Sequence, residues 1–167
     1  MLETLLHHEF WLSLEYLPLA EQIGATWLFP LVNSLHVLSI CLMLGALFML
    51  DLRIAGVAAR QYSIQQLERD FLPWVWVTFV VAVVTGVALF ITRASAHVLN
   101  PAFQMKMLLM LLAAINMAFF HWCFRYNRNS VDSGSNRLSS KLAFSAVLSL
   151  LLWAGVMLAG RWIGHIV

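Results

Sequence analysis

NSLHVLSICLMLGALFMLDLR, residues 33–53, is apolar enough to cross a lipid bilayer and yet carries a histidine near its middle. A transmembrane helix needs about 20 consecutive, mostly apolar residues, and no charged side chain occurs between Glu21 and Asp51. Three further stretches of this kind follow, so the sequence predicts spans at residues 28–50, 71–92, 102–124 and 142–160. The expected fold class is an all-α membrane protein, a bundle of four transmembrane helices.

Composition supports this class. Hydrophobic residues make up 62% of the 167 residues and charged residues only 11%, whereas soluble domains carry about a quarter charged residues. Four spans with short loops use nearly the whole chain, which leaves no room for a separate soluble catalytic module. We therefore expect one domain over residues 1–167, in contact with the lipid bilayer. The formal charge of +2 gives no reason to expect a nucleic acid as partner.

The first 20 residues are acidic as well as apolar. They contain glutamates at positions 3, 9 and 15, and no Lys or Arg occurs before Arg53, which argues against a signal peptide. Their large apolar residues include Leu5, Leu6, Phe10, Trp11, Leu14 and Tyr16. We expect an amphipathic N-terminal helix over residues 1–20 that lies in the membrane interface, ends near Pro18 and stays in the mature protein.

Lysine and arginine residues are distributed unequally between the two faces of the membrane. The loops after the first and third spans contain Arg53, Arg60, Arg69, Arg125, Arg128, Arg137 and Lys141. The opposite face has only Arg93, Lys106 and Arg161. Because basic loops stay in the cytoplasm, we expect both termini on the periplasmic or outer side.

His36 is the deepest ionisable side chain of the first span, with its Cα about 5 Å from the midplane at 1.5 Å per residue. Asn33 lies one turn earlier on the same face and is expected to orient the imidazole. Ionisable residues inside membranes mark functional sites by default. The alternatives for His36 are a neutral histidine bonded to a neighbouring helix, a haem or metal ligand, and a proton-relay or quinone-binding residue.

The third span carries a second polar stripe. Lys106, Ala113, Met117 and His121 fall on one helix face, with Asn116 beside them. Lys106 either extends its ammonium group to the boundary or contacts a carboxylate such as a haem propionate, or an anionic lipid. His121 is a candidate metal ligand at the cytoplasmic end, where an interfacial position is the alternative explanation.

The depths of His36 and His121 argue against one iron bound by both, because their Cα atoms differ in depth by about 17 Å. His97, in the outer loop, is the other candidate partner for His36 if that loop folds back onto the bundle. Lys106 or Arg161 would then lie near the propionates. A single axial ligand and a site shared across a dimer are the further alternatives. No CxxCH motif occurs, so covalent haem attachment is excluded.

Copper is the alternative metal. The soft ligands available beside the histidines are Met43, Met105, Met107, Met110 and Met117, although methionine at helical spacing also fills cores. The sequence has no nucleophile triad or phosphate loop, and its aspartates, Asp51 among them, are expected at loops. A hydrolytic enzyme is therefore not expected. Ser145 and Ser149, like Gly155 and Ala159, have the small-residue spacing of close helix packing, within the bundle or at a dimer seam.

Three stretches carry a family resemblance: SLHVLSICLMLGALFMLDLRIAG, NPAFQMKMLLMLLAAINMAFFH and LLLWAGVMLAGRWIG. From about residue 26 onward the chain resembles an uncharacterised family of small four-helix proteins of the bacterial inner membrane. It is loosely similar to the membrane part of copper-resistance protein D and to b-type cytochrome bundles. The resemblance implies an inner-membrane location and points to His36, Asp51, Arg53, Asn100, Lys106, Asn116, His121 and Arg161.

The resulting functional hypothesis is a haem-binding or redox-associated protein with haem b on His36, exchanging electrons with quinone or a partner subunit. The rival hypotheses are a copper-related or ion transporter and a non-redox accessory subunit of a membrane complex. Whether the protein is an enzyme stays open.

Overall fold

The computed structural model describes residues 2–58, 61–126 and 136–165, and every regular element in these ranges is a helix. The helices are α1 (Leu2–Glu15), α2 (Pro18–Ala25), α3 (Leu28–Ile54), α4 (Ile64–Ile91), α5 (Ala94–Leu99), α6 (Pro101–Tyr126) and α8 (Asn136–Trp162). Four segments are long and apolar enough to span a membrane: Leu28–Ile54, Ile64–Ile91, Pro101–Phe120 and Leu142–Trp162. The prediction of an all-α protein with four membrane-spanning helices is confirmed.

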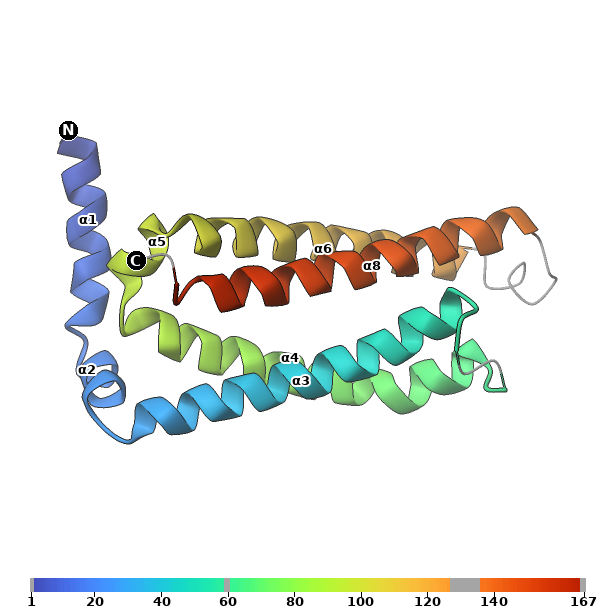
Figure 1. The fold of residues 1–167 in the computed structure, drawn as a ribbon, viewed down its shortest axis with the longest axis horizontal. Helices are drawn as coiled ribbons and strands as arrows, with labels where there is room; N and C mark the ends of the chain where they lie inside the picture. The colour runs from blue at the N-terminus through green and yellow to red at the C-terminus, as the bar shows by residue number, and fades with distance from the viewer. Residues whose placement is uncertain (1, 59–60, 127–135, 166–167) are drawn as a thin grey trace.

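The spans form two antiparallel hairpins, α3 with α4 and α6 with α8, which contact each other through α3 and α8 (Figure 1). α1, α2 and α5 lie at the end of the bundle where α8 finishes, and α1 runs across the direction of the spans (Figure 1). We call this the terminal end. The opposite end, where α3 leads into α4, is the hairpin end.

Local sequence explains where the long helices begin and end. The Ser63 hydroxyl accepts a hydrogen bond from the Gln66 backbone N–H at 3.1 Å, so α4 starts with a serine cap. α3 ends in a Schellman motif: the N–H of Val57 bonds to the Leu52 carbonyl at 2.9 Å, and Gly56 supplies the positive φ of 74°. Gly56 thus permits the tight turn that ends α3.

The middle of the bundle has an apolar core of Met43, Leu44, Ala46 and Val75, with Trp153 of α8 packed against it. Outside this core, α3, α4, α6 and α8 expose large apolar side chains, as expected of helices that face lipid. Cys41 belongs to that exposed face. The association of the two hairpins therefore depends on a small set of contacts between them.

Small residues bring α6 and α8 together. A Cβ atom at Gly155 would lie 3.2 Å from Cδ1 of Leu109, so the glycine permits the close approach. Ser145 is buried between the same two helices. These two positions pack within the bundle.

Candidate functional site

His36 lies at the interface of α3 and α4, in the half of the bundle toward the terminal end. Its Nδ1 atom is 3.0 Å from Oγ1 of Thr85, and the contact joins two helices across 49 residues of sequence. Asn33, expected to orient the ring, is exposed, and Thr85 makes the contact instead. The residue that holds the imidazole thus comes from the second span.

The hydrogen bonds of Thr85 define which imidazole nitrogen carries the proton. Thr85 Oγ1 lies 2.6 Å from the Val81 carbonyl oxygen, one turn back on α4. A carbonyl can only accept, so the hydroxyl donates its single proton there and accepts from Nδ1–H of His36. The Ala82 carbonyl on the same helix face also interacts with the ring. The lone pair is therefore on Nε2, as in a histidine that is ready to bind a metal.

Gly86 makes room for the imidazole. A Cβ atom at this position would lie 3.0 Å from Cε1 of His36 and 3.8 Å from its Nε2. Real Cβ atoms essentially never come much closer, so an alanine at this position would require the ring to move by a few tenths of an ångström. The pair Thr85 and Gly86 thus fixes both the position and the tautomer of His36.

Lys106 of α6 lies beside Gly160 of α8. Its ammonium group and the last two carbons of its chain would be 3.8 Å from a Cβ atom at Gly160 of α8. Lys106 interacts electrostatically with both His36 and His97, and among the described residues no ion pair with it is formed. We call His36, Thr85, Gly86, Lys106 and Gly160 the basic site. Each of the four spans contributes to it.

The loop that carries His97 folds back onto the bundle as the short helix α5. The His97 ring stacks on Phe103 of α6, with centroids 5.8 Å apart, and lies 6.2 Å from Phe90 of α4. Burial, helped by the nearby charges of Arg93 and Lys106, lowers the pKa of His97, and Glu15 opposes that shift. His97 is thus part of an aromatic stack, on a phenylalanine that lies one turn before Lys106 on α6.

Glu15 attaches α1 to this region. One of its carboxylate oxygens, Oε1, accepts hydrogen bonds from the Ser95 backbone N–H at 2.8 Å and from the Ser95 hydroxyl at 2.6 Å. Asn100 acts similarly at the start of α6, where Oδ1 accepts from the Ala102 N–H at 2.9 Å and Nδ2 donates to the Ile163 carbonyl at 3.1 Å. The terminal end is therefore held together by polar contacts around the basic site.

The remaining predicted ligands lie elsewhere. His121 is in the last two turns of α6, twelve residues further from the terminal end than His36 is on α3, or about 18 Å along the bundle. Its side chain is outside the described part. Arg161 is exposed in the last turn of α8. Within the described ranges, no three His, Cys, Asp or Glu side chains are placed to hold a metal ion.

Toward the hairpin end, Asn116 and Ser145 form a buried pair: Nδ2 of Asn116 donates to the Ser145 carbonyl at 3.0 Å, and the Ser145 hydroxyl donates to Oδ1 at 2.9 Å. These bonds join α6 to α8, which is a packing role.

Asp51, expected in a loop, lies inside α3 and is only 8% exposed. The Ser149 side chain is within hydrogen-bonding reach of its carboxyl group, and its Oδ2 has no partner in the described structure. Arg53 turns away and donates from Nε to the Tyr62 carbonyl at 2.7 Å. The expected loop position was wrong because the helix continues four residues past the last apolar residue of the predicted span.

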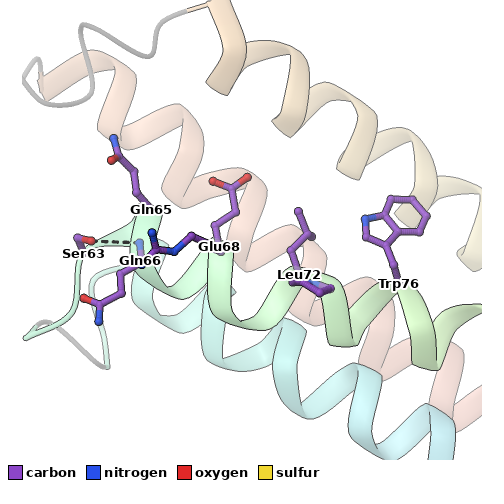
Figure 2. Close-up of a pocket in the computed structure, with 8 residues that line it drawn as sticks. Ser63, Gln65, Gln66, Glu68, Leu72 and Trp76 are labelled. Atoms are coloured by element: carbon purple, nitrogen blue, oxygen red, sulfur yellow. Dashed lines mark hydrogen bonds between the residues drawn. The ribbon is translucent and has the colours of Figure 1, made fainter.

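The sequence did not indicate a pocket of about 740 Å³ that lies along the first half of α4. It is lined by Ser63, Gln65, Gln66, Glu68, Arg69, Leu72, Pro73 and Trp76. Figure 2 shows Gln65, Glu68, Leu72 and Trp76 projecting from the same side of α4. The polar residues lie nearer the hairpin end, and the apolar ones lie further into the bundle.

Comparison with known proteins places the chain in a family. Neither curated proteins nor solved structures gave a match, so no similarity to copper-resistance protein D or to b-type cytochromes is shown. A family model described as a family of unknown function, DUF6644, matches residues 15–166, from the end of α1 through the last span. The chain therefore belongs to the DUF6644 family.

Proposed function

We propose that this protein is a redox-associated membrane protein that binds haem b through His36. The observation that carries the proposal is the hydrogen bond from Nδ1 of His36 to Thr85, which leaves Nε2 with its lone pair inside a membrane span. Axial histidines of b-type haems use this tautomer and this kind of orienting partner.

The basic site also fits the acidic side of a haem. Lys106 is a cation within electrostatic range of His36 and without an ion pair among the described residues. A haem propionate on this side would balance its charge. Gly86 and Gly160 let the two basic side chains pack closely against α4 and α8. When bound, haem supplies one-electron transfer. The chain's own residues hold the axial nitrogen, fix its tautomer and supply the compensating charge.

A second axial ligand has two candidate sources. His97 lies within electrostatic range of Lys106, as His36 does, but its ring is held in the stack with Phe103. The other source is a second copy of the chain or a partner membrane subunit. Electrons would then pass to or from quinone, or a partner subunit.

For the location we propose the bacterial inner membrane, with the terminal end at the periplasm. The support is the charge pattern: Arg53, Arg69 and their neighbours lie at the hairpin end, and the terminal end has fewer basic residues. The basic site then lies in the outer half of the membrane.

A non-redox accessory subunit is the second candidate, because the buried Asn116–Ser145 pair shows that polar residues inside these spans also serve packing. The haem content of protein purified from haem-replete cells tests the two. Haem approaching one per chain in the wild type, and little in a His36→Ala variant that inserts normally, is the expected result. A colourless wild-type protein without metal would favour the accessory subunit.

A further inference from the structure

Asp51 is a carboxyl group buried where the two hairpins meet. It belongs to α3, and only 8% of the residue is exposed. The hairpins contact each other through α3 and α8 (Figure 1), and the Ser149 side chain of α8 is within hydrogen-bonding reach of the carboxyl group. Trp153, one turn further along α8, packs against the apolar core. An acidic group therefore lies at the edge of that core.

One oxygen of the Asp51 carboxyl group, Oδ2, is buried and has no hydrogen-bond partner in the described structure. An ionised carboxylate offers about four acceptor positions and no donor. A buried charge is unfavourable unless it is paired and hydrogen-bonded, and a bound proton removes the charge. The unpartnered oxygen is therefore a place for a proton.

No charged side chain among the described residues compensates Asp51. On α3, Arg53 donates from Nε to the Tyr62 carbonyl at 2.7 Å. On α8, the nearby Ser149 is uncharged. The side chain of Lys141, about two turns before Ser149, lies outside the described part, so the experiment includes a variant of it.

The charged residues at the start of α4 are directed to the pocket and to solvent. Glu68 and Arg69 line that pocket, and Nε of Arg69 lies 4.0 Å from the Asp70 carboxylate, with both of these side chains exposed. The buried residues of this part of α4 are apolar: Leu67 is 4% exposed, and Phe71 packs against the core that contains α3 residues. α4 therefore supplies no partner charge for Asp51 either.

Asp51 is close to water at the hairpin end. α3 has 27 residues and is about 40 Å long, so it exceeds a hydrocarbon core of about 30 Å by about 10 Å. With the excess shared between both ends, Asp51 lies near the boundary between hydrocarbon and headgroups, because α3 ends three residues later at Ile54. A proton from the hairpin end has only about one helical turn to cross.

Ser149 can serve the carboxyl group with and without a proton. Its hydroxyl group donates to an ionised carboxylate and, after rotation, accepts from a carboxylic acid. The hydroxyl group of Ser145, one turn earlier on α8, is already bonded to Asn116. The site therefore tolerates both states, whereas a lysine or arginine partner would hold the carboxyl group in its charged form.

We propose that Asp51 is a proton-binding site that exchanges its proton with water at the hairpin end. Uptake adds one proton to one carboxylate oxygen, and no electron is transferred. His36 lies 15 residues earlier on α3, about 22 Å away along the helix. The proton site is thus separate from the basic site and does not rest on haem binding.

Labelling with dicyclohexylcarbodiimide, a lipid-soluble reagent that reacts with protonated carboxyl groups, tests the site in wild-type protein in lipid nanodiscs. The chain has eight acidic residues, and mass spectrometry of peptides identifies those that react. At neutral pH we expect Asp51 to be labelled about tenfold or more over the exposed Asp70, because a carboxyl group in water is almost fully ionised. The same labelling in His36→Ala would show that the site is independent of haem.

Infrared difference spectra recorded across a pH titration test the exchange itself. We expect the carbonyl band of a carboxylic acid that titrates, shifts in D2O, disappears in Asp51→Asn and persists in Asp70→Asn. Ser149→Ala should move the band to higher wavenumber, because the carbonyl loses a hydrogen bond. Ser39→Ala is the matched control, since this buried serine bonds to the Leu35 carbonyl of its own helix.

Three outcomes would overturn the proposal. A band of Asp51 that is unchanged at every pH would mean a carboxyl group that does not exchange its proton. Absence of both label and band, with the label appearing in Lys141→Met, would mean a fixed ion pair with Lys141. Absence of both in Lys141→Met as well would mean a carboxylate that stays ionised. Equal band shifts in Ser149→Ala and Ser39→Ala would remove Ser149 from the site.

Discussion

Nδ1 of His36 and Oγ1 of Thr85 lie 3.0 Å apart, and the Thr85 hydroxyl is already committed as a donor to the Val81 carbonyl. This relationship makes His36 a hydrogen-bond donor through Nδ1 and leaves the lone pair on Nε2. The account of the basic site depends on it, and each part of the site can be altered separately.

Replacing Thr85 by valine keeps the shape of the side chain and removes the acceptor for Nδ1–H. We expect the His36 tautomers to mix and haem affinity to fall roughly tenfold or more, as when the orienting partner of a metal ligand is lost. Nitrogen-15 NMR of the histidines and haem titration measure the two effects. Thr78→Val is the matched control, because Thr78 bonds only to carbonyls of its own helix. Equal losses in both variants would contradict the role of Thr85.

Gly86→Ala should displace the His36 ring, because the added Cβ would meet Cε1 at 3.0 Å. Overpacking of this kind costs about 1–3 kcal/mol. We expect lower thermal stability and a perturbed His36 signal. Gly45→Ala, on α3, is the control, since nothing lies within 4 Å of its Cβ position. An unchanged His36 signal in Gly86→Ala would show that the glycine does not position the ring.

Lys106→Met tests the charge of the basic site. Methionine retains most of the apolar length beside Gly160 and removes the ammonium group. We expect weaker haem retention with normal membrane insertion, measured as haem per chain after repeated washing. Arg161→Met, an exposed basic residue one position after Gly160 on α8, serves as control. Identical retention in wild type and Lys106→Met would remove Lys106 from the site.

We expect the stability of the terminal end to depend on pH because of His97. Its pKa in the folded protein is lowered, mainly by burial, so below the unfolded-state value of about 6.5 the unfolded state binds more protons. The contribution of His97 to stability is therefore fully present above pH 6.5 and is lost as the pH falls through the folded pKa. Hydrogen exchange of the α5 amides at pH 7.5 and pH 5 measures this, and His97→Phe should reduce the difference. A difference of the same size in His97→Phe would assign the pH effect to another group.

The proposed orientation places both termini in the periplasm. An alkaline phosphatase fusion after the last residue should be active, and a fusion between α3 and α4 should be inactive. The reversed pattern would place the basic site in the cytoplasmic half of the membrane.

The four spans could be predicted because apolar length decides membrane insertion. His36 was visible because it is an ionisable residue inside an apolar stretch. Thr85 could not be predicted, because a threonine inside a span does not interrupt the apolar pattern. Its neighbour Gly86 was the available signal, because a glycine inside a span permits the close approach of a side chain from another helix. Asn33 was expected to orient His36 because the two residues are one turn apart on the same helix, whereas the residue that contacts His36 lies on α4. Asp51 was placed in a loop because the uncharged apolar stretch ends at Leu50, whereas the helical backbone continues to Ile54.

The most direct test of the central claim is a reduced-minus-oxidised visible spectrum of detergent-purified wild type and His36→Ala from haem-replete cells. The account predicts a b-type α-band and Soret band in the wild type, both lost in His36→Ala while the variant stays in the membrane fraction. A flat wild-type spectrum, or an unchanged spectrum in His36→Ala, would contradict it.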